Sequence, residues 1–449
     1  MHKQKIKAFF CFLFIVAISI LPGMINQQTA KTAAPASAVG AELPGYQIIG
    51  KKQIQDDAKQ LVSLLESTHP AFSLGDIPKG YSAAKEQFLT AADKEMTVDD
   101  FRWLSREYLA SMGDGHTAIW QNFENDSFLN IFWVVNGDHL DLTDQQGNCL
   151  QQEVIAIGGV GVQTIFQTVN RYFSAENSAG LYWNGTLYSG FTPILSRSGV
   201  DCSKGSVVLT IKSGTQTVKK RVGFIDQNPN SRNGRSGVVS TSVIGDIFYI
   251  DFNECKTGLE IDKAAIRLSE AIAKGFTKVI VDVSDNSGGD SSTGQQLLAM
   301  MAMRPPSYGV YTRFSHLYSE AKKGLVQEKE GAAYVESKPN LSTAVRNKKI
   351  SLVVLTNEGT FSSATQLAVW VQDGKLGTVI GTPSANSPNC YGDYASFQLN
   401  NTGISGQASC KRWLRPDETA NPKALIPDIP TPYNVDSLKV AIRYLDDKA

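Results

Sequence analysis

The sequence predicts a largely parallel α/β core, preceded by a helical region and a mainly β region. From residue 239 onward, buried apolar runs alternate with helical segments, which is the pattern of βα units. Between residues 128 and 225, short β-like runs are separated by Asn-Gly, Gly-Gly and Ser-Gly turns, which predicts a separate β module. Residues 46–127 show helical apolar spacing instead.

The first residues are typical of an export signal. A basic start, Met1-His-Lys-Gln-Lys, precedes a mostly apolar run over 8–21 that ends at Pro22-Gly23. This run is short for a membrane span, so we expect a signal peptide over 1–23, with an uncleaved anchor as the alternative. Residues 24–45 have a linker composition. We therefore expect an exported protein, periplasmic or extracellular, without an integral span once the signal is removed.

Composition excludes several classes of protein. Apolar residues make up 42% and charged residues 19%, which indicates an ordered globular chain. Lys+Arg and Asp+Glu are both 43, so no basic surface is predicted for nucleic acid or anionic lipid. The five histidines and the cysteines show no metal-ligand spacing. We expect neither a metal nor a cofactor.

Export would place the cysteines in an oxidising compartment. Cys390 and Cys410 flank a predicted hairpin and could pair. Cys149 and Cys202 both lie in the β module and could also form a disulfide. Cys255 would then be unpaired.

The predicted elements follow in order. Thr97 opens one helix as a capping residue, and Gly113 is a suitable stop after it. One helix, 162–169, interrupts the β module, and 226–238 reads as a linker. In the core, 239–449, predicted strands and helices then alternate. The strands are at 246–252, 278–283, 350–355 and 378–381, and the helices are at 262–274, at 295–303 and from 363. A polar segment at 304–346 interrupts the alternation.

A tight turn is predicted between the strand 350–355 and the helix that follows it. This turn would put Ser362 at a helix N-terminus, where free N–H groups and the helix dipole favour negative charge. A serine that attacks an acyl carbon needs such a setting. Alternatively, Ser362 and Ser363 merely cap the helix.

A second turn, at the end of the strand 278–283, carries Gly288 and Gly289. Both turns lie at carboxyl ends of parallel strands, where α/β proteins build sites. Glycine amides and the amide of Ser363 could together bind an oxyanion, although Gly288-Gly289 could also be an ordinary strand–helix turn. His116, which follows Gly113 and Gly115 at a helix end, is the candidate base; it could equally be an isolated surface histidine.

Five motifs in this order resemble the S41 serine peptidases, which include the tail-specific (C-terminal processing) proteases, the tricorn core and the chlamydial secreted protease. Each motif is loose, but the five keep their order over residues 46–435. They are Gly113-Asp-Gly-His116-Thr, the strand 279–283 with Asn286-Ser-Gly288-Gly289, Gly359-Thr-Phe-Ser362-Ser-Ala, Val379-Ile-Gly-Thr and Ile426-Pro-Asp428-Ile.

The resemblance implies a crotonase/ClpP-like catalytic core over 239–449, an N-terminal helical domain over 46–127 and a PDZ-like module over 128–225. The tail-specific branch uses a Ser/Lys dyad, but this chain has Ser387 where that lysine is expected. The tricorn-like branch pairs its serine with a histidine, which His116 matches.

The third catalytic member departs from that branch. Where the tricorn-like enzymes have a glutamate before the Pro-Asp pair, this chain has Asn421, and the nearest upstream carboxylate is Glu418. An asparagine carbonyl can orient a histidine, as in Cys-His-Asn proteases. Glu418 could also reach the histidine.

We therefore expect a secreted serine endopeptidase that acts on polypeptides. Ser362 would form an acyl-enzyme, with His116 as base and the amides of Gly288, Gly289 and Ser363 around the oxyanion. One alternative is a catalytically inactive peptide-binding protein of the same family type. A crotonase-like acyl-transfer enzyme is another, against which export and the lack of a basic CoA-binding cluster count.

Overall fold

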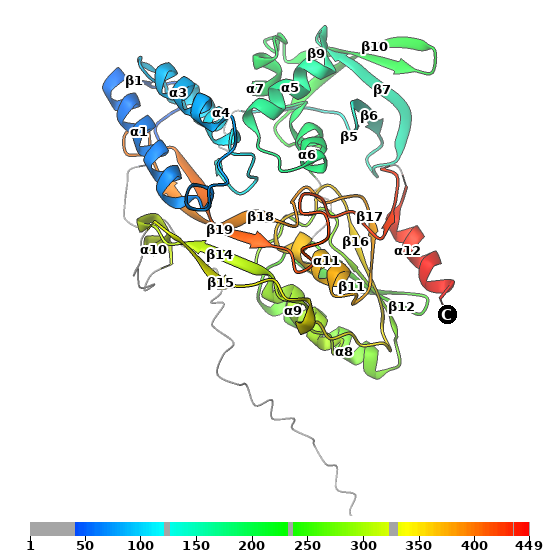
Figure 1. The fold of residues 1–449 in the computed structure, drawn as a ribbon. Coiled ribbons are helices and arrows are strands. Elements are labelled where there is room, and N and C mark those ends of the chain that lie inside the picture. Colours follow the sequence, from blue (N-terminus) through cyan, green and yellow to red (C-terminus); the bar gives the residue numbers. More distant parts are fainter. Residues whose placement is uncertain (1–40, 121–125, 232–236, 323–330, 434, 449) are drawn as a thin grey trace, which may run out of the picture.

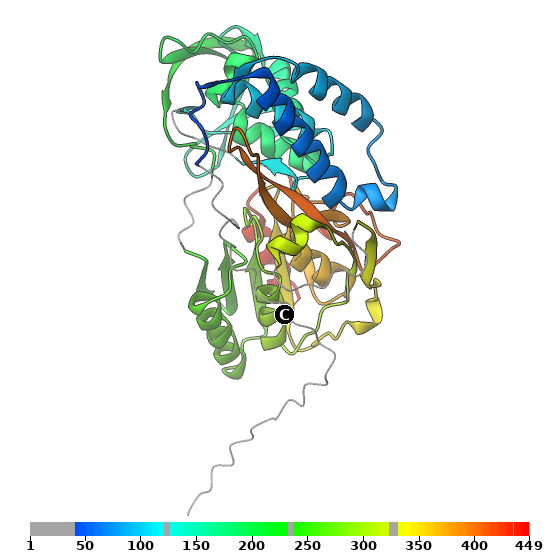
Figure 2. The ribbon, with the colours of Figure 1, turned by 90° about the vertical axis from the view of Figure 1, so that its left-hand side faces the viewer.

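The computed structural model describes residues 41–120, 126–231, 237–322, 331–433 and 435–448. The predicted signal peptide and most of the predicted linker 24–45 lie outside these residues, as does part of the predicted linker 226–238. Among the described residues, no helix is both long and apolar enough to cross a bilayer. In Figures 1 and 2 the helical region and the β module both lie above the α/β core.

The helical region begins with a short antiparallel pair, β1 (Ile48–Ile49) and β2 (Met96–Thr97). Thr97 caps the helix that follows β2, because its side chain accepts a hydrogen bond from the amide of Asp100. The buried faces of the longer helices share one core that includes Ile54, Phe101 and Tyr108. The helices are α1 (Lys51–Thr68), α2 (Ala71–Leu74), α3 (Tyr81–Ala91) and α4 (Val98–Ala110).

Residues 128–225 form their own sheet, whose strand order is β4-β10-β9-β7-β6-β5, with β8 beside β7. Its strands are β4 (Phe128–Leu129), β5 (Trp133–Asn136), β6 (His139–Thr143), β7 (Cys149–Ile157), β8 (Val160–Gly161), β9 (Ser206–Ser213) and β10 (Gln216–Ile225). Three helices lie between β8 and β9: α5 (Val162–Tyr172), α6 (Ser178–Tyr188) and α7 (Thr192–Arg197). The sequence predicted only the first, because α6 contains two glycines and several aromatic residues, which are poor helix formers.

The core sheet has the order β11-β12-β13-β16-β17-β20. The β11–β12 pair is antiparallel and all the other pairs are parallel, which agrees with the predicted βα alternation. Its strands are β11 (Val239–Ile244), β12 (Ile247–Phe252), β13 (Lys278–Asp282), β16 (Ser351–Thr356), β17 (Thr378–Gly381) and β20 (Ile429–Pro430).

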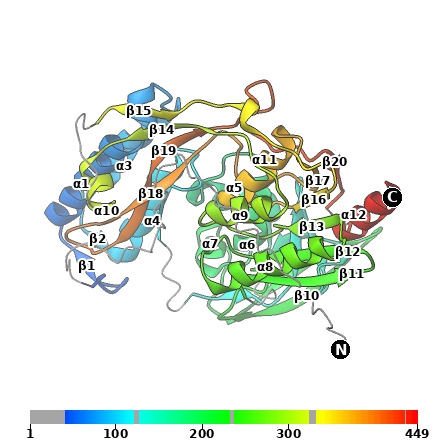
Figure 3. The same cartoon turned by 90° about the horizontal axis from the view of Figure 1, so that it is seen from below.

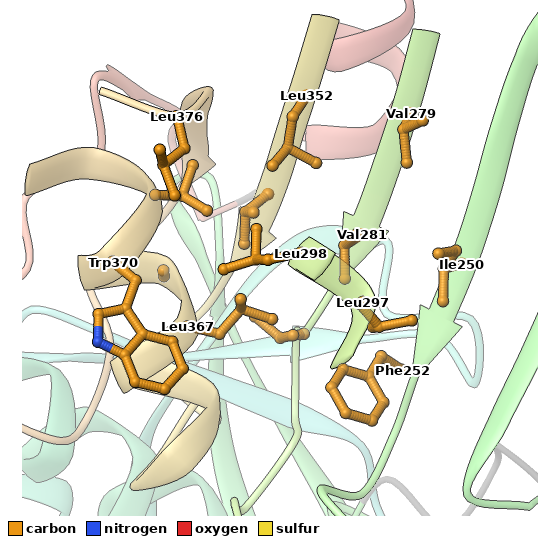
Figure 4. Packing of buried hydrophobic residues seen from close by; sticks show 14 of the residues in the cluster. Ile250, Phe252, Val279, Val281, Leu297, Leu298, Leu352, Leu367, Trp370 and Leu376 are labelled. Carbon is orange, nitrogen blue, oxygen red and sulfur yellow. The ribbon is translucent and has the colours of Figure 1, made fainter. Parts of the chain in front are cut away.

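Helices cover both faces of this sheet. One face packs on α8 (Leu259–Ala273), α9 (Ser292–Met300) and α11 (Ser363–Asp373), and Figure 4 shows Leu297 and Leu298 of α9 among side chains of the sheet such as Val281. The opposite face packs on α12 (Ser437–Asp446). Alternate residues of each strand serve the two faces, as expected for a strand buried on both sides.

The predicted polar segment at 304–346 contributes to a further sheet, of order β15-β14-β19-β18, with β3 beside β19. Its elements are β3 (Ala118–Ile119), β14 (Gly309–Arg313), β15 (Ala333–Ser337), β18 (Cys390–Gln398) and β19 (Ser405–Leu414), with α10 (His316–Ala321) and the 3₁₀ turn Leu341–Thr343 in the same polar segment. Seen from below, the β18–β19 hairpin reaches from the α/β core to the helical region (Figure 3).

This hairpin joins two regions that are far apart in sequence. Phe397, Leu399 and Ile404 belong to the core of the helical region. In addition, β3 pairs with β19, so the segment that follows His116 is fixed to the hairpin. The hairpin thereby holds the end of the helical region against the α/β core.

The cysteine pairs considered from the sequence do not form in the structure, where Cys149, Cys202, Cys255, Cys390 and Cys410 are all free thiols. In the β18–β19 register, Cys390 lies opposite Trp413 rather than opposite Cys410. The hairpin prediction was therefore right in outline, but its register separates the two sulfurs.

Candidate active site

Ser362 lies at the turn between β16 and α11, as the sequence predicted. Its backbone has φ 51° and ψ −123°, a region that residues with a side chain rarely adopt. The helix begins at Ser363, and the Ser362 side chain makes no capping hydrogen bond to it. The structure therefore does not support the alternative that the Ser362 side chain caps the helix. A strained, non-capping serine at a helix N-terminus is typical of a functional position.

His116 reaches this serine from the end of the helical region. Its Nε2 lies 2.9 Å from Ser362 Oγ, although 246 residues separate the two positions. The backbone of His116 is held on both sides: its amide donates to Asp114 Oδ1 at 2.9 Å, and its carbonyl accepts from the Gln407 side chain at 2.9 Å. The Phe361 ring packs against the imidazole at 4.7 Å between centroids.

Burial sets the charge state of this histidine. It lowers the pKa of His116 below its ordinary value of 6.5, and the negative charge of Asp114 offsets this only in part. The imidazole is therefore neutral at pH 7 and can accept a proton from a serine hydroxyl.

Asp114 organises the loop that carries His116. Its Oδ2 accepts hydrogen bonds from His69, Thr117 and Ser409. Since Nδ1 of His69 accepts the amide of Ala71, the proton of His69 is on Nε2, which donates to Asp114. Burial opposes ionisation of Asp114, but the hydrogen bonds from His69 and Thr117 outweigh it and hold the pKa of the carboxyl well below its ordinary range.

The predicted oxyanion donors require one correction. The amide of Gly288 donates to the Asn286 side chain at 2.8 Å, so it is not available to a ligand. Gly289 differs. The amide of Cys255 donates to the carbonyl of Gly288, and the amide of Asp290 donates to the carbonyl of Cys255. Because Gly289 lies between these two bonds, its own amide is directed away from Cys255. Ser363, as the first residue of α11, has an amide without an acceptor inside the helix.

The structure has neither Asn421 nor Glu418 in the predicted orienting role. Both are exposed, whereas the His116 ring is buried. The Asn421 side chain accepts the amides of Lys423 and Ala424, which closes a local turn. Spacing relative to the Pro-Asp pair therefore misled the prediction, because the loop before that pair folds on itself.

Two carboxylates that the prediction did not include lie near Nδ1 of His116. Asp114 Oδ1 and Glu176 Oε1 are each 3.9 Å from this nitrogen. Glu176 comes from the β module, in the segment between α5 and α6. Asp114 could have been noticed within the Gly113-Asp-Gly-His116 motif, but the spacing of Glu176 along the chain gives no signal, since its approach depends on how the module docks.

Asp114, His116 and Glu176 also place one potential metal-ligand atom each within 4.8 Å of one another. The carboxylate oxygens, however, already accept hydrogen bonds from neighbouring side chains and amides. These N–H and O–H groups point their positive hydrogens at the carboxylate oxygens and would repel a metal ion there. We therefore assign no metal ligands to this cluster.

Comparison with known proteins agrees with this geometry. The model of peptidase family S41 matches residues 244–431, a range that includes both turns of the site. No curated protein matches the chain in sequence. Among solved structures, mature CPAF is similar, with 12% identity, 88% of this chain and 96% of that chain covered, and a TM-score of 0.63.

A second structure, of mature CPAF complexed with lactacystin, has 12% identity and a TM-score of 0.62 and covers 89% of this chain and 97% of that chain. At this identity the likeness concerns the fold, and it extends over nearly the whole of both chains, the ClpP-like α/β core included. The family match adds to this likeness: residues 244–431, which include Ser362, match peptidase family S41 and so support a serine-type peptidase.

Proposed function

We propose that this protein is an exported serine endopeptidase that cleaves polypeptides through an acyl-enzyme on Ser362. The observation that carries the proposal is the 2.9 Å contact between Ser362 Oγ and His116 Nε2, made by a buried imidazole and a serine with φ 51°. A serine that only caps a helix needs neither this backbone strain nor a histidine.

The reaction follows from these positions. His116 Nε2 takes the proton of Ser362 while Oγ attacks the carbonyl carbon of the peptide bond. The amides of Gly289 and Ser363 hold the negative charge that develops on the carbonyl oxygen. The imidazolium then returns its proton to the leaving amine, and a water molecule, deprotonated by His116, hydrolyses the ester.

Export rests on the N-terminal sequence alone. The basic start and the apolar run over 8–21 support a cleaved signal peptide. N-terminal sequencing of the protein recovered outside the cytoplasm of its host tests this: a mature start beyond residue 23 is expected, and an intact Met1 would contradict it.

Hydrolysis of an unfolded, carboxymethylated polypeptide tests the activity. The wild-type protein should produce internal fragments, and Ser362→Ala and His116→Ala should not. The alternative, an inactive peptide-binding protein, predicts that the wild type binds the same polypeptide as tightly as Ser362→Ala does and that neither cleaves it.

A further inference from the structure

Nδ1 of His116 is unsatisfied, and this is unusual for a buried ring nitrogen. The His116 side chain is only 8% exposed, yet in the described part of the chain Nδ1 makes no hydrogen bond of normal geometry; the Tyr391 backbone lies close enough to the ring to raise the pKa of His116, as an acceptor would. Because Nε2 must accept the serine proton, the proton of the neutral ring has to be on Nδ1. A buried N–H without an acceptor is costly, so a group close to Nδ1 should accept it.

The two carboxylates at 3.9 Å are not equivalent candidates. Asp114 Oδ1 already accepts the backbone amide of His116, and its Oδ2 accepts three further donors. It is fixed within the same loop as the histidine, so it cannot approach Nδ1 without breaking that loop. Glu176 Oε1 has a looser set of donors, the amide of Gly115 at 3.3 Å and the Asn386 side chain at 3.0 Å.

Glu176 is also held where it faces the ring. Its Oε2 accepts the Asn386 side chain and the amide of Ser387, both at 2.9 Å. The next residue, Asn177, donates to the carbonyls of Ser384 and Lys423, each at 3.1 Å. The segment between α5 and α6 is thus docked on loops of the α/β core, with the glutamate side chain 7% exposed.

The absence of a side chain at Gly115 allows this approach. A Cβ there would lie 3.3 Å from Glu176 Oε1 and 2.7 Å from the ring of Phe361, which itself packs on His116. The glycine therefore leaves space that both the glutamate and the phenylalanine use. A Glu176–His116 contact then needs a shift of about 1 Å, which is within what such hydrogen bonds change between free and substrate-bound enzymes.

We propose that Glu176, contributed by the β module, is the positioning residue of His116. On this inference, which rests on the proposed peptidase function, Glu176 Oε1 accepts the Nδ1–H hydrogen bond and fixes the tautomer with a free lone pair on Nε2. The carboxylate takes no part in bond making. The β module is then part of the catalytic machinery, because the site lacks its third member without it.

The ionisation of Glu176 provides a distinguishing readout. Burial, and then the charge of Asp114, raise the pKa of Glu176 to about 8, against the effect of the amide donors around it. Besides Asp114 and His116, the titratable group facing Glu176 is Cys390, whose pKa burial raises well above its ordinary value, so it stays a neutral thiol. Ionised Glu176 accepts from Nδ1–H in a charge-assisted hydrogen bond, whereas its protonated form accepts more weakly and can instead donate its own proton, which favours the wrong tautomer.

The substitution Glu176→Gln tests the role. The glutamine oxygen should accept the hydrogen bonds that Asn386 and Ser387 donate. The glutamine NH₂ group then faces Nδ1 of His116, and as a donor it favours the tautomer that is protonated on Nε2. We expect the rate of Ser362 labelling by a fluorophosphonate to fall by about 10²-fold or more at pH 9, with partial recovery in Glu176→Asp. The wild-type rate should rise near pH 8, and Glu176→Gln should lack this rise.

Two variants serve as comparisons. Asp57→Asn removes another buried carboxylate that accepts several donors, including the amide and hydroxyl of Thr402, far along the chain from the site. It should lower stability but leave the pH profile of labelling unchanged. Asp114→Asn removes a charge that raises the pKa of Glu176, so the rise in rate should move to lower pH and persist.

A measurement on the wild type covers the case in which Glu176→Gln does not fold. In ¹⁵N-histidine spectra above pH 8, the signals lost in His116→Ala should belong to an imidazole protonated on Nδ1. Protonation on Nε2 would overturn the inference, as would labelling of Glu176→Gln at the wild-type rate and with the wild-type pH profile. If the wild type is not labelled at Ser362 at all, it is the proposed function that fails.

Discussion

Gly288 lies so close to Ser362 that a Cβ on the glycine would come within 2.6 Å of the serine Cβ. The same Cβ would lie 2.9 Å from the amide nitrogen of Ser363 and 2.9 Å from the carbonyl oxygen of Phe361. Real Cβ atoms do not approach other atoms at 2.6 Å, and Ser362 is part of a strained backbone turn. The glycine is therefore required by the position of Ser362 and not by oxyanion binding.

Gly288→Ala should therefore inactivate the protein. The added methyl group displaces Ser362, and a misplacement of about 1 Å at a reacting atom costs about 10²-fold in rate. Gly275→Ala is a matched control, because Gly275 has φ 98° against 97° for Gly288, but a Cβ at Gly275 would meet no atom within 4 Å. Both variants should lose stability from the strained backbone, and only Gly288→Ala should lose hydrolysis of the unfolded polypeptide. Equal activity in the two would contradict the close-packing argument.

We expect Ser363 to contribute its amide and not its hydroxyl. The Ser363 side chain donates to the carbonyl of Gly289 at 2.7 Å, which helps to hold the Gly289 peptide. Losing one such exposed hydrogen bond costs about 1 kcal/mol, so Ser363→Ala should keep its kcat/KM within about tenfold of the wild type. Ser362→Ala should have no measurable activity. A reversed order in the hydrolysis assay would show that the nucleophile is one residue further along.

The sequence predicted most of the architecture because the signals involved are local. Strands buried on both faces, amphipathic helices and glycine turns follow from short-range patterns, and the turns carrying Ser362 and Gly289 were placed in this way. The position of His116 after two glycines at a helix end made it the candidate base, and the family resemblance favoured its pairing with Ser362, since local patterns carry little information about a contact across 246 residues.

Other features could not be predicted for physical reasons. Which glycine amide is available depends on the direction of each peptide plane, which is set here by Asn286 and Cys255. The approach of Glu176 depends on the docking of a separate sheet. The fixing of β3 on β19 is likewise a tertiary pairing of two short segments, one of which has only two residues.

Acidification should reduce activity through His116 only below pH 6.5. The base must be neutral, and burial lowers the pKa of His116 from 6.5, so the loss through His116 should have its midpoint on the acid side of this value. The separate rise near pH 8 belongs to Glu176 and should be absent from Glu176→Gln. The pH dependence of kcat/KM checks this, and an acid midpoint above 6.5 in Glu176→Gln would mean that the histidine is not desolvated.

Glu176 should reduce the stability of the protein as the pH rises. Its pKa is about 8 in the folded protein against an ordinary 4.5, so between these values the folded state holds a proton that the unfolded state has lost. Stability then falls with rising pH over this window, by up to about 1.4 kcal/mol per pH unit. Glu176→Gln lacks this loss. The difference in Tm between variant and wild type should grow from about pH 5 to about pH 8, and a constant difference would contradict a raised pKa.

Covalent labelling with a fluorophosphonate, followed by peptide mapping, is the sharpest test of whether Ser362 is an activated nucleophile. The reagent reacts with an activated serine and not with one that only caps a helix, so it needs no knowledge of the natural substrate. We expect a single adduct on Ser362 in the wild type, and none in Ser362→Ala or His116→Ala. An unlabelled Ser362 in folded wild-type protein, or labelling that persists without His116, would contradict this expectation.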